Sequence, residues 1–265
     1  MFELDEVALK FPTDYNESMN TVLTQEALKY NRLIKIMKVQ LVDIQKALVG
    51  EVVMSEDLDA MGTSLFDNQV PLLWATKGFL SLKPLGSWMM DLLERISFLT
   101  KWIEKGSPPA FWISGFFFPQ AFFTATLQNY ARKHIIAIDE LKFDFKIIDE
   151  YSLNEITEKP DDGCYIYGMF MEGARWNSTT HLLDDSNPKQ LYTEMPIVWF
   201  IPKKNRVTPV DGIYMCPIYK VLSRSGTLST TGHSTNYCLM IELPSNREQD
   251  EWIRAGVALF LALRY

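Results

Sequence analysis

The run 228–236 carries the densest set of reactive side chains in this sequence, including Ser229, His233 and Ser234. A serine nucleophile with a histidine base would make it a hydrolase loop. However, neighbouring residues on a strand point to opposite faces, and Asn236 stands where a GxSxG elbow needs its second glycine. The alternative is a tight turn at Gly232 in which Ser and Thr hydroxyls bond the backbone. We favour the turn.

A second cluster, Glu172-Gly173-Ala174-Arg175-Trp176, places an acid, a base and an aromatic ring in one short run. Glu172 and Arg175 could bind a ligand, pair with each other or pair with a nearby group. An arginine beside a tryptophan in a strand-rich region typically stacks or makes a structural ion pair. We therefore interpret this cluster as structural.

The sequence lacks the motifs of nucleotide and metal chemistry. No GxxxxGK[ST], GxGxxG or HExxH run occurs. The histidines, His134, His181 and His233, are far apart in the sequence, although folding could bring two together. The sequence therefore predicts no catalytic residue, no cofactor-binding residue and no metal site.

Composition narrows the partners. The 265 residues are 47% hydrophobic and 22% charged, as in ordinary globular proteins, with a net charge of −7. Nucleic-acid binding needs a concentrated basic surface, so no nucleic-acid partner is expected, although a small local basic patch remains compatible with this charge. We interpret Lys203-Lys204 with Arg206 as a solvated turn.

The cysteines and the apolar segments indicate an intracellular globular protein. Cys164, Cys216 and Cys238 lack CxxC spacing, which favours three reduced, buried thiols in a cytosolic compartment over disulfides or zinc. The segment 106–131 has no charged residue and is long enough to span a bilayer, but prolines, Gln and Asn interrupt it. We expect a buried core segment there, no membrane partner, and no secretory signal in residues 1–10.

The first half of the sequence has helical periodicity. Apolar residues recur at steps of three and four over 19–48, which predicts a helix from a cap at Asp14 or Asn16 to about Val49. A shorter helix is expected over 55–68.

Two more helices are marked by prolines at their starts, over 84–106 and 119–134. On the first of these, the apolar face is expected to leave four charged side chains able to reach water: Asp91, Glu94, Arg95 and Lys101.

A period of two begins near residue 141 and predicts strands. They are expected at 165–171, 197–201, 213–221, 237–243 and 257–263. The sequence thus predicts an α+β fold in which a helical N-terminal half is followed by a small antiparallel β-barrel, with a boundary at 138–150.

Several segments together resemble the C-terminal region of dynein heavy chains, in the order of that family and over nearly the whole sequence. The subclass resembled is the axonemal inner-arm, single-headed type. Ala125, Cys238 and Ala255 depart from the expected pattern. The segments are Val53-Met54-Ser55, Ser81-Leu82-Lys83-Pro84-Leu85, Trp112-Ile113-Ser114-Gly115-Phe116, Gln128-Asn129-Tyr130-Ala131-Arg132-Lys133, Glu172 to Trp176, Cys216-Pro217-Ile218-Tyr219-Lys220, Leu228 to Asn236, and Trp252-Ile253 followed by Gly256-Val257-Ala258-Leu259.

The resemblance implies a division of the chain. Residues 1–70 would be the closing helices of a sixth AAA+ module, 71–142 the helical part of the dynein C-terminal domain, and 143–265 its β-barrel part. The parent would be an ATP-driven, minus-end-directed microtubule motor of ciliary or flagellar axonemes, located in the cytoplasm and cytoskeleton. Its nucleotide sites and microtubule-binding stalk would lie in other segments, so this chain is not expected to be an enzyme. Its partners would be the other AAA+ modules of the same heavy chain.

The expected role is a non-catalytic cap that braces and regulates the AAA+ ring. Candidate anchors are Trp74, Trp88, Trp102 and Trp112, most of them expected inside the protein's own core. Two alternatives remain: a purely structural assembly module of the motor, and a stand-alone serine hydrolase using His233.

Overall fold

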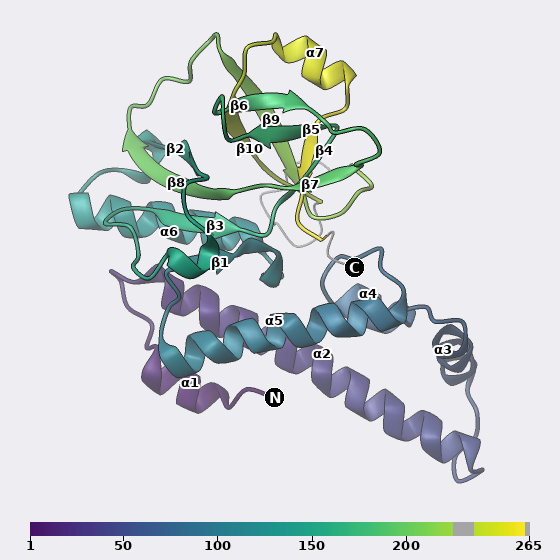
Figure 1. Ribbon diagram of the computed structural model, residues 1–265. Helices are drawn as coiled ribbons and strands as arrows, with labels where there is room; N and C mark the ends of the chain where they lie inside the picture. The colour runs from purple at the N-terminus through teal and green to yellow at the C-terminus, as the bar shows by residue number, and fades with distance from the viewer. Residues whose placement is uncertain (225–235, 263–265) are drawn as a thin grey trace.

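The computed structural model describes residues 1–224 and 236–262. In that part of the chain, a layer of helices lies beneath a region of β-sheets, with α6 between them (Figure 1). The helices are α1 (Leu4–Lys10), α2 (Ser18–Leu48), α3 (Glu56–Phe66), α4 (Leu72–Lys77), α5 (Leu85–Lys105), α6 (Pro119–His134) and α7 (Gln249–Arg254).

The long helix α2 runs the length of the lower layer and ends beside α3 (Figure 1). Its cap is Glu17, whose carboxylate accepts the N–H of Met19 at 3.1 Å, rather than Asp14 or Asn16 as expected. Most of its buried side chains lie between Met19 and Met37, and Ile44 is buried farther along, beside α3.

The other expected helices are confirmed as α3, α5 and α6. The Ser55 hydroxyl accepts the N–H of Leu58 at 3.3 Å and so caps α3. Pro84 and Gly106 flank α5, and Gly106 has the positive φ of +92° that favours glycine after a helix. Pro119 is the first residue of α6.

The strands form three separate sheets. They are β1 (Ala110–Trp112), β2 (Leu141–Ile148), β3 (Cys164–Tyr167), β4 (Phe170–Glu172), β5 (Ala174–Asn177), β6 (Leu182–Asp185), β7 (Tyr192–Glu194), β8 (Ile197–Lys204), β9 (Ile213–Tyr219), β10 (Tyr237–Pro244) and β11 (Ala258–Phe260). One sheet has the order β1-β3-β8-β2, another β10-β9-β11-β4-β7, and β5 pairs with β6.

The expected antiparallel barrel is wrong, although the mixture of helices and sheets is confirmed. β1 pairs with β3 in parallel, and β11 pairs with β9 in parallel and with β4 antiparallel. Both larger sheets also keep two distinct edge strands in the described residues, so the sheets are open and mixed. The single strand expected over 165–171 is broken at Gly168, whose φ is +87° and whose added Cβ would collide with the Trp112 ring.

The uncharged segment 106–131 joins the two layers. It divides into β1, a short 3-10 turn and α6. Its aromatic rings form a cluster, in which the centre of the Phe122 ring lies 4.8 Å from that of Phe111 and 4.9 Å from that of Phe116. One cluster of buried apolar side chains includes both layers, with members from Val7 in α1 to Leu261 after β11, and Ala258 and Phe260 form a second, small cluster. Among the described helices, none combines the length and the apolar character needed to cross a bilayer.

Candidate functional site

The hydrolase candidates Ser229, His233 and Ser234 lie outside the described residues. Asn236, at the end of the same run, is buried and joins two backbone segments. Its side chain accepts the N–H of Val221 at 2.8 Å and donates to the carbonyl of the same residue at 3.1 Å. The Asn236 amide therefore ties the residue before β10 to the segment just after β9.

The cluster at Glu172 and Arg175 is divided between two ion pairs. Arg175 contacts Asp184 at 2.5 Å, and Glu172 pairs with Arg224. The Trp176 indole donates to the carboxylate of Asp149 at 2.7 Å. The acid and the base of this cluster therefore face different partners and do not form one ligand site.

The two described histidines lie in different parts of the fold. His134 Nε2 is 3.2 Å from Asp162, and His181 Nδ1 is 3.2 Å from Asp149. Within residues 1–224 and 236–262, no group of three His, Cys, Asp or Glu side chains is placed to hold a metal ion.

The three cysteines are free and buried, as expected. Burial raises the pKa of Cys164 to about 12 and that of Cys238 to about 12, and it also raises the pKa of Cys216. Such thiols are protonated at neutral pH and are poor nucleophiles.

The solvated turn expected at Lys203, Lys204 and Arg206 is wrong for Arg206. Its guanidinium is largely buried and contacts Glu242 at 2.6 and 2.5 Å and Asp144 at 2.9 Å. It thereby bridges strands β2 and β10 of different sheets. The acids Asp144 on β2 and Glu242 on β10 are far from Arg206 in the sequence, so no local pattern indicated these ion pairs.

A buried ionic network lies on α5 where it faces α2, although the sequence predicts that the charged side chains of α5 reach water. Asp91 and Arg95 are both buried, with Arg95 Nε 3.2 Å from Asp91 Oδ1, and Lys83 lies 3.5 Å from the same carboxylate. The expectation that Asp91 and Arg95 reach water is therefore wrong. Each charge is kept in the core by an opposite charge.

Glu26 on α2 completes this polar seam. Its buried carboxylate accepts the N–H groups of Phe117 at 2.7 Å and Phe118 at 3.1 Å, just before α6. Burial raises the pKa of Glu26, and the two N–H groups act against that rise. This side chain fixes the segment that links the two layers.

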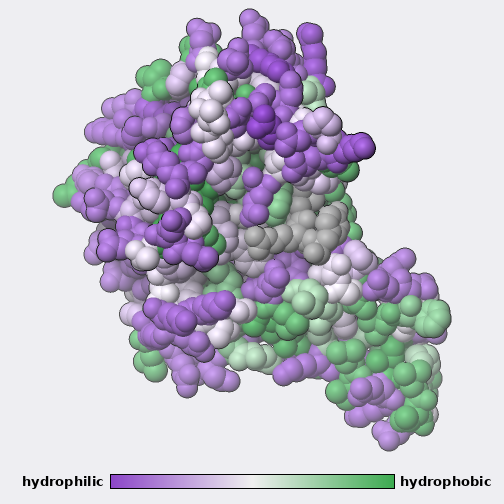
Figure 2. Space-filling model, viewed as in Figure 1, coloured by the Kyte–Doolittle hydropathy of each residue, from purple (hydrophilic) through white to green (hydrophobic). Residues whose placement is uncertain are grey.

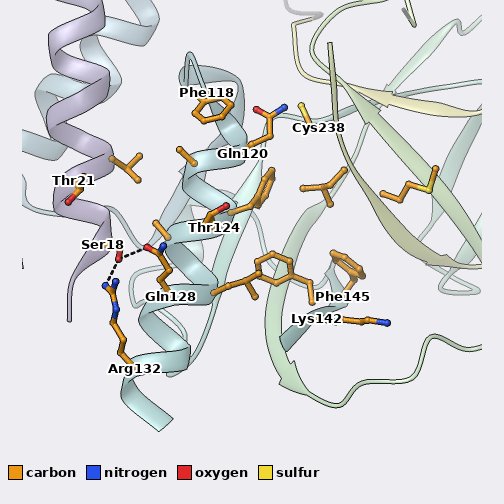
Figure 3. A pocket seen from close by; sticks show the side chains of 18 of the residues that line it. Ser18, Thr21, Phe118, Gln120, Thr124, Gln128, Arg132, Lys142, Phe145 and Cys238 are labelled. Atoms are coloured by element: carbon orange, nitrogen blue, oxygen red, sulfur yellow. Dashed lines mark hydrogen bonds between the residues drawn. The ribbon is translucent and has the colours of Figure 1, made fainter. Parts of the chain in front are cut away.

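A groove of about 1100 Å³ lies between the start of α2, α6 and the strands β2 and β10 (Figure 3). At its rim Ser18 donates to Gln128 at 2.8 Å and accepts from Arg132 at 2.6 Å. Its wall is apolar and includes Phe143 and Phe145. The Ser18 hydroxyl is therefore bonded to an amide and a guanidinium, neither of which acts as a general base.

The far end of the helical layer exposes a continuous apolar surface, which we call the apolar arm. Figure 2 shows it as the green region over the end of α2, α3 and α4. Phe66 is 92% exposed, Val53 87% and Leu72 82%. The other members are Leu48, Val49, Val52, Met54, Leu73, Leu80, Leu82, Met90 and Leu93. Exposed patches of this kind mark interaction surfaces.

The sequence did not identify these residues as contacts. The tryptophans chosen as candidate anchors, Trp74, Trp88, Trp102 and Trp112, are all buried in the protein's own core. The signal that could have found the arm is the apolar stripe of α2, which continues to the exposed Leu48, beyond Ile44, the last buried residue of the helix.

Comparison with known proteins agrees with the resemblance noted in the sequence. Residues 1–261 match the family of C-terminal domains of the dynein heavy chain. The protein is 57% identical over 263 residues to dynein axonemal heavy chain 1 of Mus musculus, 48% over 257 residues to dynein axonemal heavy chain 3 of Homo sapiens, and 46% over 263 residues to dynein axonemal heavy chain 12 of Rattus norvegicus.

These alignments cover 99%, 97% and 99% of the present sequence but only 6%, 6% and 8% of the three relatives. The protein therefore spans a small part of the length of the curated relatives it matches. The family match includes both the helical layer and the sheets, so it applies to the fold as a whole. The resemblance is confirmed, and the protein belongs to the family of dynein C-terminal domains, from the heavy chains of that motor.

Proposed function

We propose that this protein is the non-catalytic C-terminal cap of an axonemal dynein heavy chain, and that it braces and regulates an AAA+ ring. The parent would be a microtubule-stimulated ATPase that moves toward microtubule minus ends in cilia and flagella, of the single-headed inner-arm type. Nucleotide hydrolysis and microtubule binding would belong to other segments of the heavy chain. The names of the axonemal relatives support this assignment.

The observation that carries the proposal is the apolar arm. Burying a large apolar side chain such as Phe66 or Leu72 is worth about 1.5–3 kcal/mol, so a dozen exposed ones need a covering surface. In a protein that spans only a small part of its relatives, the covering surface would be the preceding AAA+ module of the same heavy chain. The proposed division follows, with residues 1–70 closing the sixth module, 71–142 forming the helical part of the cap and 143–265 its sheet-bearing part.

Regulation would follow if the cap made different contacts with different conformations of the ring. A cap that packs better on one conformation of the ring shifts the ring's population toward that conformation by the difference in its affinity for the two. The alternative role, a purely structural brace, would stabilise both conformations equally and leave the ATPase cycle unchanged.

The test is made in the full-length parent heavy chain. Deletion of residues 71–265 should change microtubule-stimulated ATPase and gliding speed in a ring that remains folded. An unchanged rate with a less stable ring would refute regulation and leave a structural brace.

A finer variant addresses the arm itself. Phe66→Asp with Leu72→Asp should weaken packing of the cap and alter the ATPase rate, because each places a charge in the proposed interface. The matched control is Val210→Asp, since Val210 is 92% exposed and lies away from the arm between β8 and β9. If the double variant and the Val210→Asp control change the ATPase rate equally, that result would count against the arm as the interface. A His233→Ala variant that removed a measurable esterase activity would favour the hydrolase instead.

A further inference from the structure

A second cleft, which we call the basic cleft, lies where the middle of α2, the end of α4 and the segment before α6 meet. Its volume is about 650 Å³. Five cations line it and no acidic residue does, although the protein has a net charge of −7. The cations are Lys29, Arg32, Lys35, Lys77 and Lys220.

Lys220 is the most unusual of these cations. It is 8% exposed, and no carboxylate in the described residues pairs with it. Its Nζ lies 5.9 Å from the centre of the Phe118 ring, and Lys29 Nζ lies 5.3 Å from the centre of the same ring. Burial lowers the pKa of Lys220, and the nearby Lys29 acts in the same direction. Two like charges thus converge on one ring. The buried Glu26 carboxylate attracts both lysines, yet the pKa of Lys220 stays lowered, so a bound anion would stabilise the pair further.

The remaining cations come from two other directions. Arg32 and Lys35 follow Lys29 along α2 at intervals of three residues, so they lie on one side of the helix. None of them makes an ion pair within the described part of the protein. Lys77 approaches from the end of α4.

Aromatic rings complete the lining. Phe79, Phe117 and Phe118 contribute apolar surface beside the cations. A cleft of this volume is in the usual range for small-molecule sites. Lysine ammonium groups are common ligands of phosphate groups, and an aromatic face can stack against a planar base.

We propose that the basic cleft binds a compact, multiply charged phosphate compound, with Lys29 and Lys220 contacting the phosphate groups. Two sources share this chemistry, a linear polyphosphate and a nucleoside polyphosphate whose base stacks on a phenylalanine ring. A compact ligand fits better than an acidic peptide, because the two least exposed cations, Lys29 and Lys220, converge on one ring.

The experiment titrates the protein with sodium tripolyphosphate and, separately, with ATP, by isothermal calorimetry at low and at physiological salt. Both anions should bind at one site, more weakly at higher salt. Lys29→Met and Lys220→Met should each weaken binding at least ~10-fold, which is the loss of one charged hydrogen bond. Lys105→Met is the matched control, because Lys105 is exposed at the end of α5 and does not line the cleft.

The outcomes distinguish a linear polyphosphate from a nucleoside polyphosphate and test whether the basic cleft is the binding site. If tripolyphosphate and ATP bind with equal affinity, the cleft recognises the phosphate groups alone. If ATP binds more tightly, the aromatic rings also contact the base. Both results support the proposal. No binding, or equal weakening by Lys105→Met, would overturn it. Tighter binding of a polyglutamate peptide than of tripolyphosphate would also overturn it, in favour of a peptide surface. If Lys220→Met does not fold, Lys29→Met still decides the result, since Lys29 is only partly buried.

Discussion

Replacement of Arg95 by methionine should destabilise the protein strongly, because it breaks the buried network between α2 and α5. Arg95 is 3% exposed, and its guanidinium lies 3.2 Å from Asp91 and 4.0 Å from the centre of the Phe79 ring. Methionine fills much of the apolar volume but leaves Asp91 with a single partner, Lys83, at 3.5 Å. Breaking a buried ion pair from one side costs about 3–5 kcal/mol. That is a large share of the roughly 5–15 kcal/mol that stabilises a typical domain.

Urea unfolding followed by tryptophan fluorescence provides the assay. Trp88 stacks on Phe79 at 5.2 Å, so its emission reports on the same cluster. The matched control is Lys133→Met, which removes an exposed ion pair with Asp162 and should leave the urea midpoint unchanged.

A double variant tests the physical reason. Asp91→Leu combined with Arg95→Met removes both charges and should be more stable than Arg95→Met alone, because no buried carboxylate remains that has lost its nearer cation. In this variant Lys83 no longer has the Asp91 carboxylate, which opposes the lowering of its pKa by burial. A loss below about 1 kcal/mol for Arg95→Met, or a double variant no more stable than the single one, would refute the reasoning.

Three further predictions concern single residues. Gly163→Ala should lower stability by at least about 2 kcal/mol in thermal unfolding, because φ is +78° and the new Cβ would collide with the Phe200 carbonyl; an unchanged Tm would contradict this. Burial acts to raise the pKa of Asp144, but hydrogen bonds from the two cations that contact it lower the pKa below its usual range. Its stabilisation is therefore present above the unfolded pKa of about 4 and is lost as pH falls, so Asp144→Asn should flatten the acid side of the stability profile. Cys164 and Cys238, with pKa values raised to about 12, should resist iodoacetamide near pH ~8 until guanidinium unfolds the protein, as mass spectrometry would detect.

Helices α2, α3, α5 and α6 could be predicted because their signals are local, whereas the short helices α1, α4 and α7 were not predicted. Ser55, Pro84, Gly106 and Pro119 mark helix ends through caps and fixed backbone angles that neighbouring residues alone decide. The exception is the start of α2, where a glutamate serves as the cap in place of the more usual Asp or Asn nearby.

The sheets were harder because their pairing is decided by distant segments. β8, β9 and β10 have alternating or continuous apolar patterns and were predicted. The short strands β5, β6 and β7 are rich in polar residues and are defined mainly by their partners. The parallel pairing of β1 with β3 joins residues 110–112 to 165–167, and no local pattern predicts it. This non-local pairing is why a barrel was expected where open sheets occur.

The polar core was missed for a similar reason. A pattern on one helix assigns Asp91 and Arg95 to water by residue type, whereas the two side chains pair with each other in the core. The same holds for Arg206, whose acidic partners Asp144 and Glu242 come from other strands. The arm and the basic cleft likewise depend on which helices cover which faces.

The position of β11 has a consequence for synthesis on the ribosome. β11 lies between β9 and β4, yet it is the last of the sheet's five strands to be translated. Until it emerges, β9 with β10 and β4 with β7 are two separate pairs, each with an open edge. A nascent polypeptide would therefore expose the open edge of β4 once β7 has been made, and the open edge of β9 as well once β10 has been made. A premature stop codon before Ala258 would make that state permanent, so a nonsense mutation this late would affect folding of the whole sheet.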